Sequence, residues 1–68
     1  MKTEYDQEAD AAYIYLVDKI EKGQVEKTIQ LNDSLSVDFD KNNKLVGIEI
    51  LNASKMLTKV KDFQKVAA

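Results

Sequence analysis

Apolar residues recur at every second position in several stretches of this chain. That period predicts β-strands with one face in the core and one face toward water. The alternating stretches are residues 1–6, 25–31, 35–39 and 45–51. Polar turn residues separate them, and the segment Lys41–Lys44 between the last two strands reads as a hairpin loop because Asn tolerates left-handed backbone.

The last two strands also predict their own register, because both carry an apolar triplet. If the pairing slipped by one residue, every β-branched side chain of one strand would point toward water. Placing both triplets in the core sets three pairs opposite one another: Phe39 with Val46, Val37 with Ile48, and Leu35 with Ile50.

The segment Ala11–Val17 is apolar on both faces and fits two interpretations. Residues 8–12 have good helix composition, whereas Tyr13–Val17 is rich in aromatic and β-branched residues. We favour a central strand over a helix, because a strand covered on both faces shows this pattern.

After Asn52 the apolar period changes to steps of three and four, which is typical of a helix with one apolar stripe. The sequence predicts a helix over 53–66, with Asn52 as its N-cap. Lysines occupy its other faces and suggest a solvated surface or an acidic partner. We therefore predict one α+β domain over 1–68: a small antiparallel β-meander of four to five strands (1–51), followed by one C-terminal α-helix packed on the sheet.

The composition of the chain excludes several classes of functional site and partner. The 68 residues contain no Cys, His or Arg, and the net charge is −2. Disulfides, thiolate metal sites and a histidine base are therefore excluded, and nucleic acid is not an expected partner. We predict that the chain is not an enzyme, needs no cofactor, does not enter a membrane and resides in the cytoplasm. Because so short a chain has a marginal core, we expect it to associate with itself, most simply as a dimer.

The carboxylates offer one candidate site. Asp38 and Glu49 are predicted to be diagonal neighbours on the face away from the apolar triplets. Clustered carboxylates suit a hard divalent cation, although a solvated acidic face is the favoured interpretation. The cation candidates are Asp6, Asp10, Asp38, Asp40 and Glu49.

Aromatic residues and one glycine complete the candidates. Gly47 lies in the middle of a strand, where we expect a bulky side chain such as Tyr13 or Tyr15 to fill the space above it; a binding notch is the alternative. Aromatics with a polar tip are common at interfaces and also fill cores. The interface candidates are Tyr5, Tyr13, Tyr15 and Val17.

Three motifs resemble a known family. The opening Tyr5–Ile14 is similar to Y-D-x-E-A-D-x-x-Y-I, Val37–Asp40 to V-D-x-D, and Val46–Ser54 to V-G-I-E-I-L-x-A-S. They occur in this order in Domain of Unknown Function 2283, a family of small prokaryotic proteins. The resemblance covers roughly residues 2 to 57. Gln7 and Asn43 stand where the family often has Pro and Gly, and the predicted helix extends beyond the family core.

The resemblance implies a strand at 12–17 and no catalytic residues. At most it implies an antitoxin-type role toward a protein encoded beside it. Taken together, the sequence predicts a non-enzymatic protein-interaction module that acts as a homo-oligomer. The alternative is a domain that binds a small ligand or a divalent cation through its carboxylates.

Overall fold

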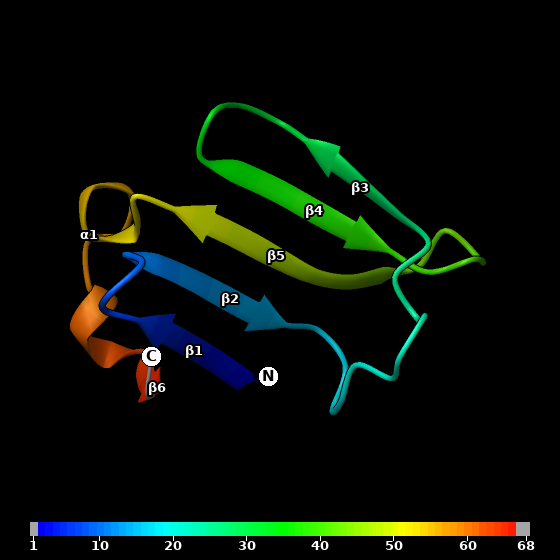
Figure 1. Ribbon diagram of the computed structural model, residues 1–68, viewed down its shortest axis with the longest axis horizontal. Helices are drawn as coiled ribbons and strands as arrows, with labels where there is room; N and C mark the ends of the chain where they lie inside the picture. Colours follow the sequence, from blue (N-terminus) through cyan, green and yellow to red (C-terminus); the bar gives the residue numbers. More distant parts are fainter. Residues whose placement is uncertain (1, 67–68) are drawn as a thin grey trace.

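The protein is one sheet whose strands follow the order β3-β4-β5-β2-β1-β6 (Figure 1). The computed structural model describes residues 2–66, and side chains through residue 63. Five strands form antiparallel neighbours, and the sixth adds to β1 in parallel. The strands are β1 (Lys2–Asp6), β2 (Ala11–Tyr15), β3 (Lys27–Gln30), β4 (Leu35–Phe39), β5 (Leu45–Leu51) and β6 (Gln64–Val66).

The predicted antiparallel strands are confirmed, including the strand interpretation of the ambiguous segment, but the predicted meander order is wrong. β2 lies beside β5 and not beside β3, because the long connection 16–26 carries the chain to the far edge of the sheet. β2 is a central strand that pairs with β1 on one side and β5 on the other. The strand predicted over 1–6 occupies Lys2–Asp6 among the described residues, and the strand predicted over 25–31 is shorter, at Lys27–Gln30. The loop 41–44 is also confirmed, with Asn43 in left-handed backbone (φ 62°).

Two of the three predicted pairs between β4 and β5 are confirmed: Leu35 opposite Ile50, and Val37 opposite Ile48. The third is wrong, because the register shifts between Asp38 and Phe39 and Phe39 pairs with Leu45. A β-bulge of this kind adds one residue to one strand. It leaves Val46 without a directly opposite residue in β4, and Val46 is fully buried there.

The predicted C-terminal helix is wrong over most of its length. Helix α1 is a single turn, Ala53–Met56, followed by a 3-10 turn at Val60–Asp62 and by β6. Asn52 occupies the N-cap position as predicted, but it adopts left-handed backbone (φ 53°) and its side chain makes no capping hydrogen bond. A helix of about 14 residues is marginal alone, and the free edge of β1 offers backbone partners to an extended chain.

The core lies between one face of the sheet and the segment after β5. Tyr5, Ala12 and Ile50 lie side by side on β1, β2 and β5, and Ala53 packs on them. We call this side of the sheet the core face. Further apolar side chains pack around this cluster from both sides: Ile14, Leu35, Ile48, Leu57, Val60 and Phe63.

Candidate functional site

The opposite side of the sheet, which we call the tyrosine face, carries most of the polar groups singled out in the sequence. Residues directly opposite one another in a sheet point to the same face, so the register assigns its members. One row runs across the strands through Glu4, Tyr13, Glu49 and Ser36; the next runs through Lys2, Tyr15, Gly47, Asp38 and Thr28. Asp38 and Glu49 are therefore diagonal neighbours on this face, as predicted.

Gly47 is the position where the tyrosine face is most tightly built. A Cβ placed on it would lie 2.5 Å from Cε2 and Cζ of Tyr13, so the ring of Tyr13 occupies the space above the glycine. The interpretation of Gly47 as a position filled by an aromatic side chain is thus confirmed. The ring is fixed at its tip, because the Tyr13 hydroxyl donates to Oδ2 of Asp38 at 2.6 Å.

One further contact extends this arrangement across the sheet. The hydroxyl of Thr28, which stands opposite Asp38, donates to Oδ1 of the same carboxylate. Asp38 therefore accepts one hydrogen bond from β2 and one from β3, with Gly47 of β5 between them. No sequence pattern singles out Thr28. Its role becomes visible only from the pairing of β3 with β4, which sets it opposite Asp38.

Tyr15 forms the second hydroxyl–carboxylate pair on this face. Its hydroxyl donates to Oε1 of Glu4 at 2.6 Å, and its ring meets that of Tyr13 edge to face with centroids 4.8 Å apart. The Lys2 ammonium lies 4.8 Å from the centroid of the Tyr15 ring and 3.6 Å from Oε2 of Glu4. Both tyrosines of this face thus hold a carboxylate of another strand: Tyr15 that of the neighbouring β1, and Tyr13 that of β4, across β5.

Tyr5 and Asp10 form a third pair, on the core face. The Tyr5 hydroxyl donates to Oδ1 of Asp10 at 2.7 Å. The same carboxylate accepts the backbone N–H of Ser54 at 2.9 Å and its hydroxyl at 2.8 Å, while the Asp10 carbonyl accepts the N–H of Ala53 at 2.9 Å. The turn after β1 therefore caps α1, which is the task predicted for Asn52.

The three tyrosine hydroxyls share one electrostatic consequence. The pKa of Tyr13 is raised far above its ordinary value of 10.0, chiefly by burial and then by the hydrogen bond to Asp38. The pKa of Tyr15 is raised by its hydrogen bond to Glu4, and that of Tyr5 by its bond to Asp10. In each case ionisation would place a phenolate against a carboxylate.

An alkaline titration tests these pairs, since the chain has three tyrosines and no tryptophan. We expect the folded protein to show little tyrosinate absorbance at pH values where the chain in denaturant has already ionised. A folded-state pKa above the unfolded value means that the stabilisation is present below about pH 10 and is lost as the pH rises through the folded pKa. Titration of the native protein with the curve of free tyrosine would contradict the contacts.

The acidic residues do not converge on one point. Asp6 accepts the N–H groups of Glu8 and Ala9, and Asp40 accepts those of Asn42 and Lys44, so each carboxylate closes its own turn. Glu49 is exposed. Within residues 2–66, no group of three or more Asp, Glu, His or Cys side chains is placed to hold a metal ion.

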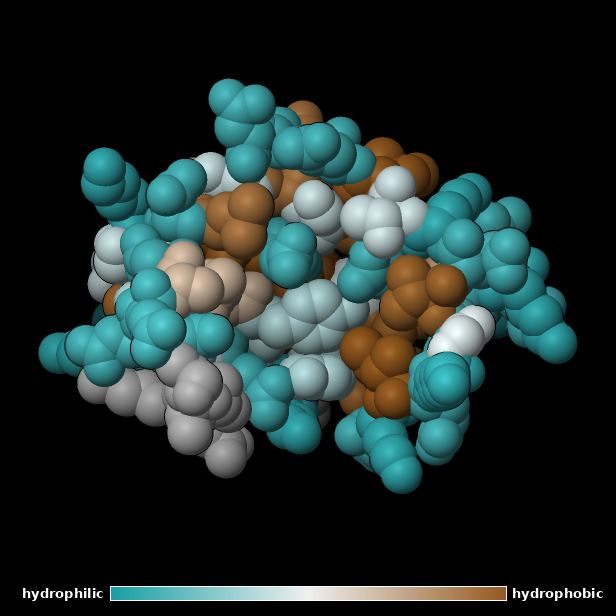
Figure 2. All heavy atoms as spheres, in the orientation of Figure 1, coloured by the Kyte–Doolittle hydropathy of each residue, from teal (hydrophilic) through white to brown (hydrophobic). Residues whose placement is uncertain are grey.

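Apolar side chains remain in water at the β3 end of the sheet. Ile29 is 43% exposed and Leu31 is 59% exposed. The register places both on the core face, since Ile29 pairs with Val37 and the N–H of Leu31 donates to the carbonyl of Leu35. In Figure 2 polar side chains stand in front of this end of the sheet, and apolar side chains emerge behind them at the upper edge of the view. We call Ile29 and Leu31, with the half-buried Val37, the β3 patch.

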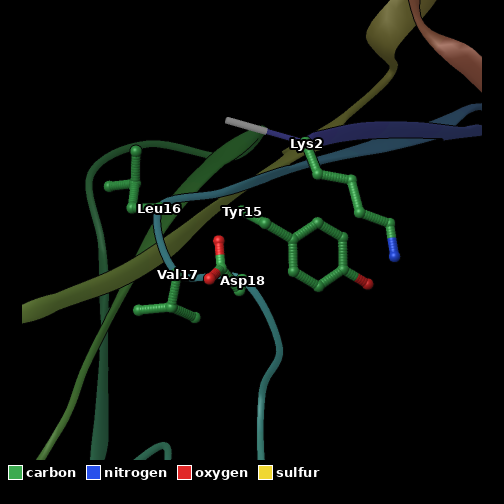
Figure 3. A pocket seen from close by; sticks show the side chains of 5 residues that line it. All are labelled: Lys2, Tyr15, Leu16, Val17 and Asp18. Carbon is green, nitrogen blue, oxygen red and sulfur yellow. The ribbon is translucent and has the colours of Figure 1, made fainter.

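Val17, one of the interface candidates, lines a hollow of about 340 Å³ where the chain leaves β2 (Figure 3). Leu16 and Val17 form its apolar side, and Lys2, Tyr15 and Asp18 contribute polar groups. The Lys2 ammonium and the Tyr15 hydroxyl are already bonded to Glu4. Tyr5 is buried and bonded within the core, so only Tyr13, Tyr15 and Val17 of the interface candidates reach the surface in part.

In the part of the chain that the structure describes, no helix has the length and apolar character required to cross a lipid bilayer. The longest regular helix in that part is the four-residue α1.

Comparison with known proteins identifies the family. Residues 2–54 match the family described as "Protein of unknown function (DUF2283)", a span that begins with β1 and ends at the serine bound by Asp10. The chain is 46% identical over 56 residues to the uncharacterised protein MJ0789 of Methanocaldococcus jannaschii, covering 82% of this chain and 44% of that protein, less than half its length. No solved structure matches. The chain therefore belongs to the DUF2283 family of proteins of unknown function.

Proposed function

We propose that the chain is a non-enzymatic protein-interaction module that acts as a homo-oligomer through the β3 end of its sheet. The observation that carries the proposal is the exposure of the β3 patch on the face that forms the core elsewhere. The α1 segment packs at the other end of that face, against Tyr5, Ala12 and Ile50. Apolar side chains left exposed on the core face are the kind of surface that association buries.

The contacts of the carboxylates favour this proposal over cation binding. Asp38 accepts two side-chain hydroxyls, and Asp10 accepts three groups from two other segments. A cation bound by either carboxylate would have to replace hydrogen bonds that hold strands or α1 in place. These carboxylates are explained by the fold itself.

Sedimentation equilibrium tests self-association. We expect the unmodified chain to associate as its concentration rises through the micromolar range, and Ile29→Lys to weaken that association by at least about tenfold, because a charged group would enter the interface. Met56→Lys is the matched control: Met56 is 45% exposed but lies on α1, away from the β3 patch. We expect it to associate like the unmodified chain.

Circular dichroism of both variants verifies that the fold is retained, since both positions are exposed. A chain that sediments as a monomer at every concentration would refute the homo-oligomer. An equal loss of association in Ile29→Lys and Met56→Lys would move the interface away from the β3 patch. The antitoxin-type role implied by the family predicts a different occupant, a protein encoded beside this chain, and co-expression of that neighbour is its test.

A further inference from the structure

The strand β3 has one edge that no other strand within residues 2–66 covers, because it ends the strand order of the sheet (Figure 1). The N–H of Leu31 donates to the carbonyl of Leu35 in β4 at 2.7 Å. Inward and outward backbone groups alternate along an antiparallel strand, so those of Ile29 also point to β4. The backbone groups of Thr28 and Gln30 therefore point away from the sheet and offer donors and acceptors to another strand.

We infer that two copies of the chain join through these edges, with β3 antiparallel to β3 about a two-fold axis at Ile29. This inference rests on the proposed self-association and specifies its geometry. Thr28 of one copy then pairs with Gln30 of the other and exchanges both backbone hydrogen bonds with it. Ile29 faces Ile29 as a non-hydrogen-bonded pair, the kind in which opposing side chains lie closest.

The side chains agree with this register. Because the axis passes through a residue rather than between two, the core face of one sheet continues into the core face of the other, and the two β3 patches meet. Lys27 of each copy lies opposite Leu31 of the other, beside the turn that carries Asp33. Opposite charges thus approach at both ends of the paired strands. An axis placed between Thr28 and Ile29 would instead set the core face against the tyrosine face.

The size of this contact also sets its strength. β3 has four residues, so the paired edges bury less than the roughly 1,200–2,000 Å² of a stable protein interface. We expect a weak dimer, with a dissociation constant in the micromolar range or higher. Neither strand carries a proline or an inward-pointing charge at its centre to prevent the pairing.

The absence of cysteine from the sequence allows a direct test by single substitutions. A disulfide needs Cα atoms between about 4.4 and 6.8 Å apart, and a non-hydrogen-bonded pair lies at about 4.5 Å. We expect Ile29→Cys to form a disulfide dimer in mild oxidant. Lys27→Cys alone should remain monomeric, because the two copies of position 27 lie about 14 Å apart along the strands. A mixture of Lys27→Cys with Leu31→Cys should cross-link into a mixed dimer.

Met56→Cys, exposed on α1, measures cross-linking by random collision. We expect its dimer yield to be at least about tenfold below that of Ile29→Cys, given the distance limits of a disulfide. If the unmodified chain sediments as a dimer but Ile29→Cys does not cross-link, or if Lys27→Cys alone does so equally well, the register is overturned while the homo-oligomer stands. If the unmodified chain is a monomer and no variant exceeds Met56→Cys, both fail.

Discussion

Replacing Gly47 by alanine is expected to destabilise the fold by about 1–3 kcal/mol, the usual effect of an added methyl group in a filled space. The new Cβ would enter the space held by the Tyr13 ring, 2.5 Å from two of its carbons. The ring would have to move, and its hydroxyl would then lose the 2.6 Å bond to Asp38. For a domain of this size each kcal/mol lowers the melting temperature by about 4–8 °C, so thermal unfolding measures the effect directly.

A double-mutant cycle separates the clash from the hydrogen bond. In a Tyr13→Phe background the ring remains, so Gly47→Ala should still be destabilising. In a Tyr13→Ala background the space is empty. There Gly47→Ala should be neutral or should stabilise the fold by up to about 0.5–1 kcal/mol, because glycine is unfavourable inside a strand. An equal effect of Gly47→Ala in all three backgrounds would show that the aromatic ring is not the reason for the glycine.

Replacing Asp10 by asparagine is expected to lower the melting temperature by several degrees near neutral pH and to flatten its dependence on pH in acid. Asparagine tolerates the left-handed backbone found at Asp10 (φ 51°), so the substitution tests the carboxylate and not the turn. Hydrogen bonds from Tyr5 and Ser54 lower the pKa of Asp10 below its ordinary value of 3.8. This stabilisation is present above that ordinary value and is lost as the pH falls through the lower, folded-state pKa.

Thermal unfolding at a series of acidic pH values provides the measurement. Asp18→Asn is the matched control, since it removes the same charge from an exposed position in the loop after β2. We expect Asp18→Asn to keep the acid dependence of the unmodified chain. A melting curve for Asp10→Asn that falls with acid as steeply as that of the control would contradict the role of Asp10 in joining the β1–β2 turn to α1.

The strands were predictable because their pattern has one dominant cause. Alternation at 35–39 and 45–51 places one face in the core, and only one register satisfies both strands at once. The bulge at Phe39 was not predictable on this basis, since an extra residue at the end of a strand leaves the apolar pattern intact. Only the backbone structure shows that Val46 is buried with no residue of β4 directly opposite it.

The C-terminal segment shows where periodicity misleads. Leu57, Val60 and Phe63 do contact the core, as a helical stripe would, but Leu57 directly follows the single α-turn, Val60 begins the 3-10 turn and Phe63 follows it. Spacing in the sequence cannot distinguish these routes when the helix has no cap of its own. The choice depends on an edge of β1 that exists only after the sheet has formed.

The sequence predicted which residues of the candidate site are neighbours on adjacent strands, but not which distant segments they contact. The register of β4 with β5 makes Asp38 and Glu49 diagonal neighbours. The place of Tyr13 over Gly47 depends on the pairing of β2 with β5, which the meander interpretation did not predict. Asp10 was a turn residue and a cation candidate, and its bond to Ser54 spans 44 positions of sequence, beyond any local pattern. The resemblance motifs contain both ends of this contact, so the family match marks residues that the periodicity does not.

The two edges of the sheet are unlike each other, and this limits how far the molecule can assemble. A sheet with an open edge strand of the same kind on both sides can add copies indefinitely and grow into a fibre. Within residues 2–66, β1 is covered by the three-residue β6, so the outermost strands are β6 and the four-residue β3, and β3 offers the longer open edge. A two-fold contact consumes that side in both copies at once and leaves short strands outermost. In the dimer inferred above, growth would therefore stop at two, with β6 covering the other edge of each sheet.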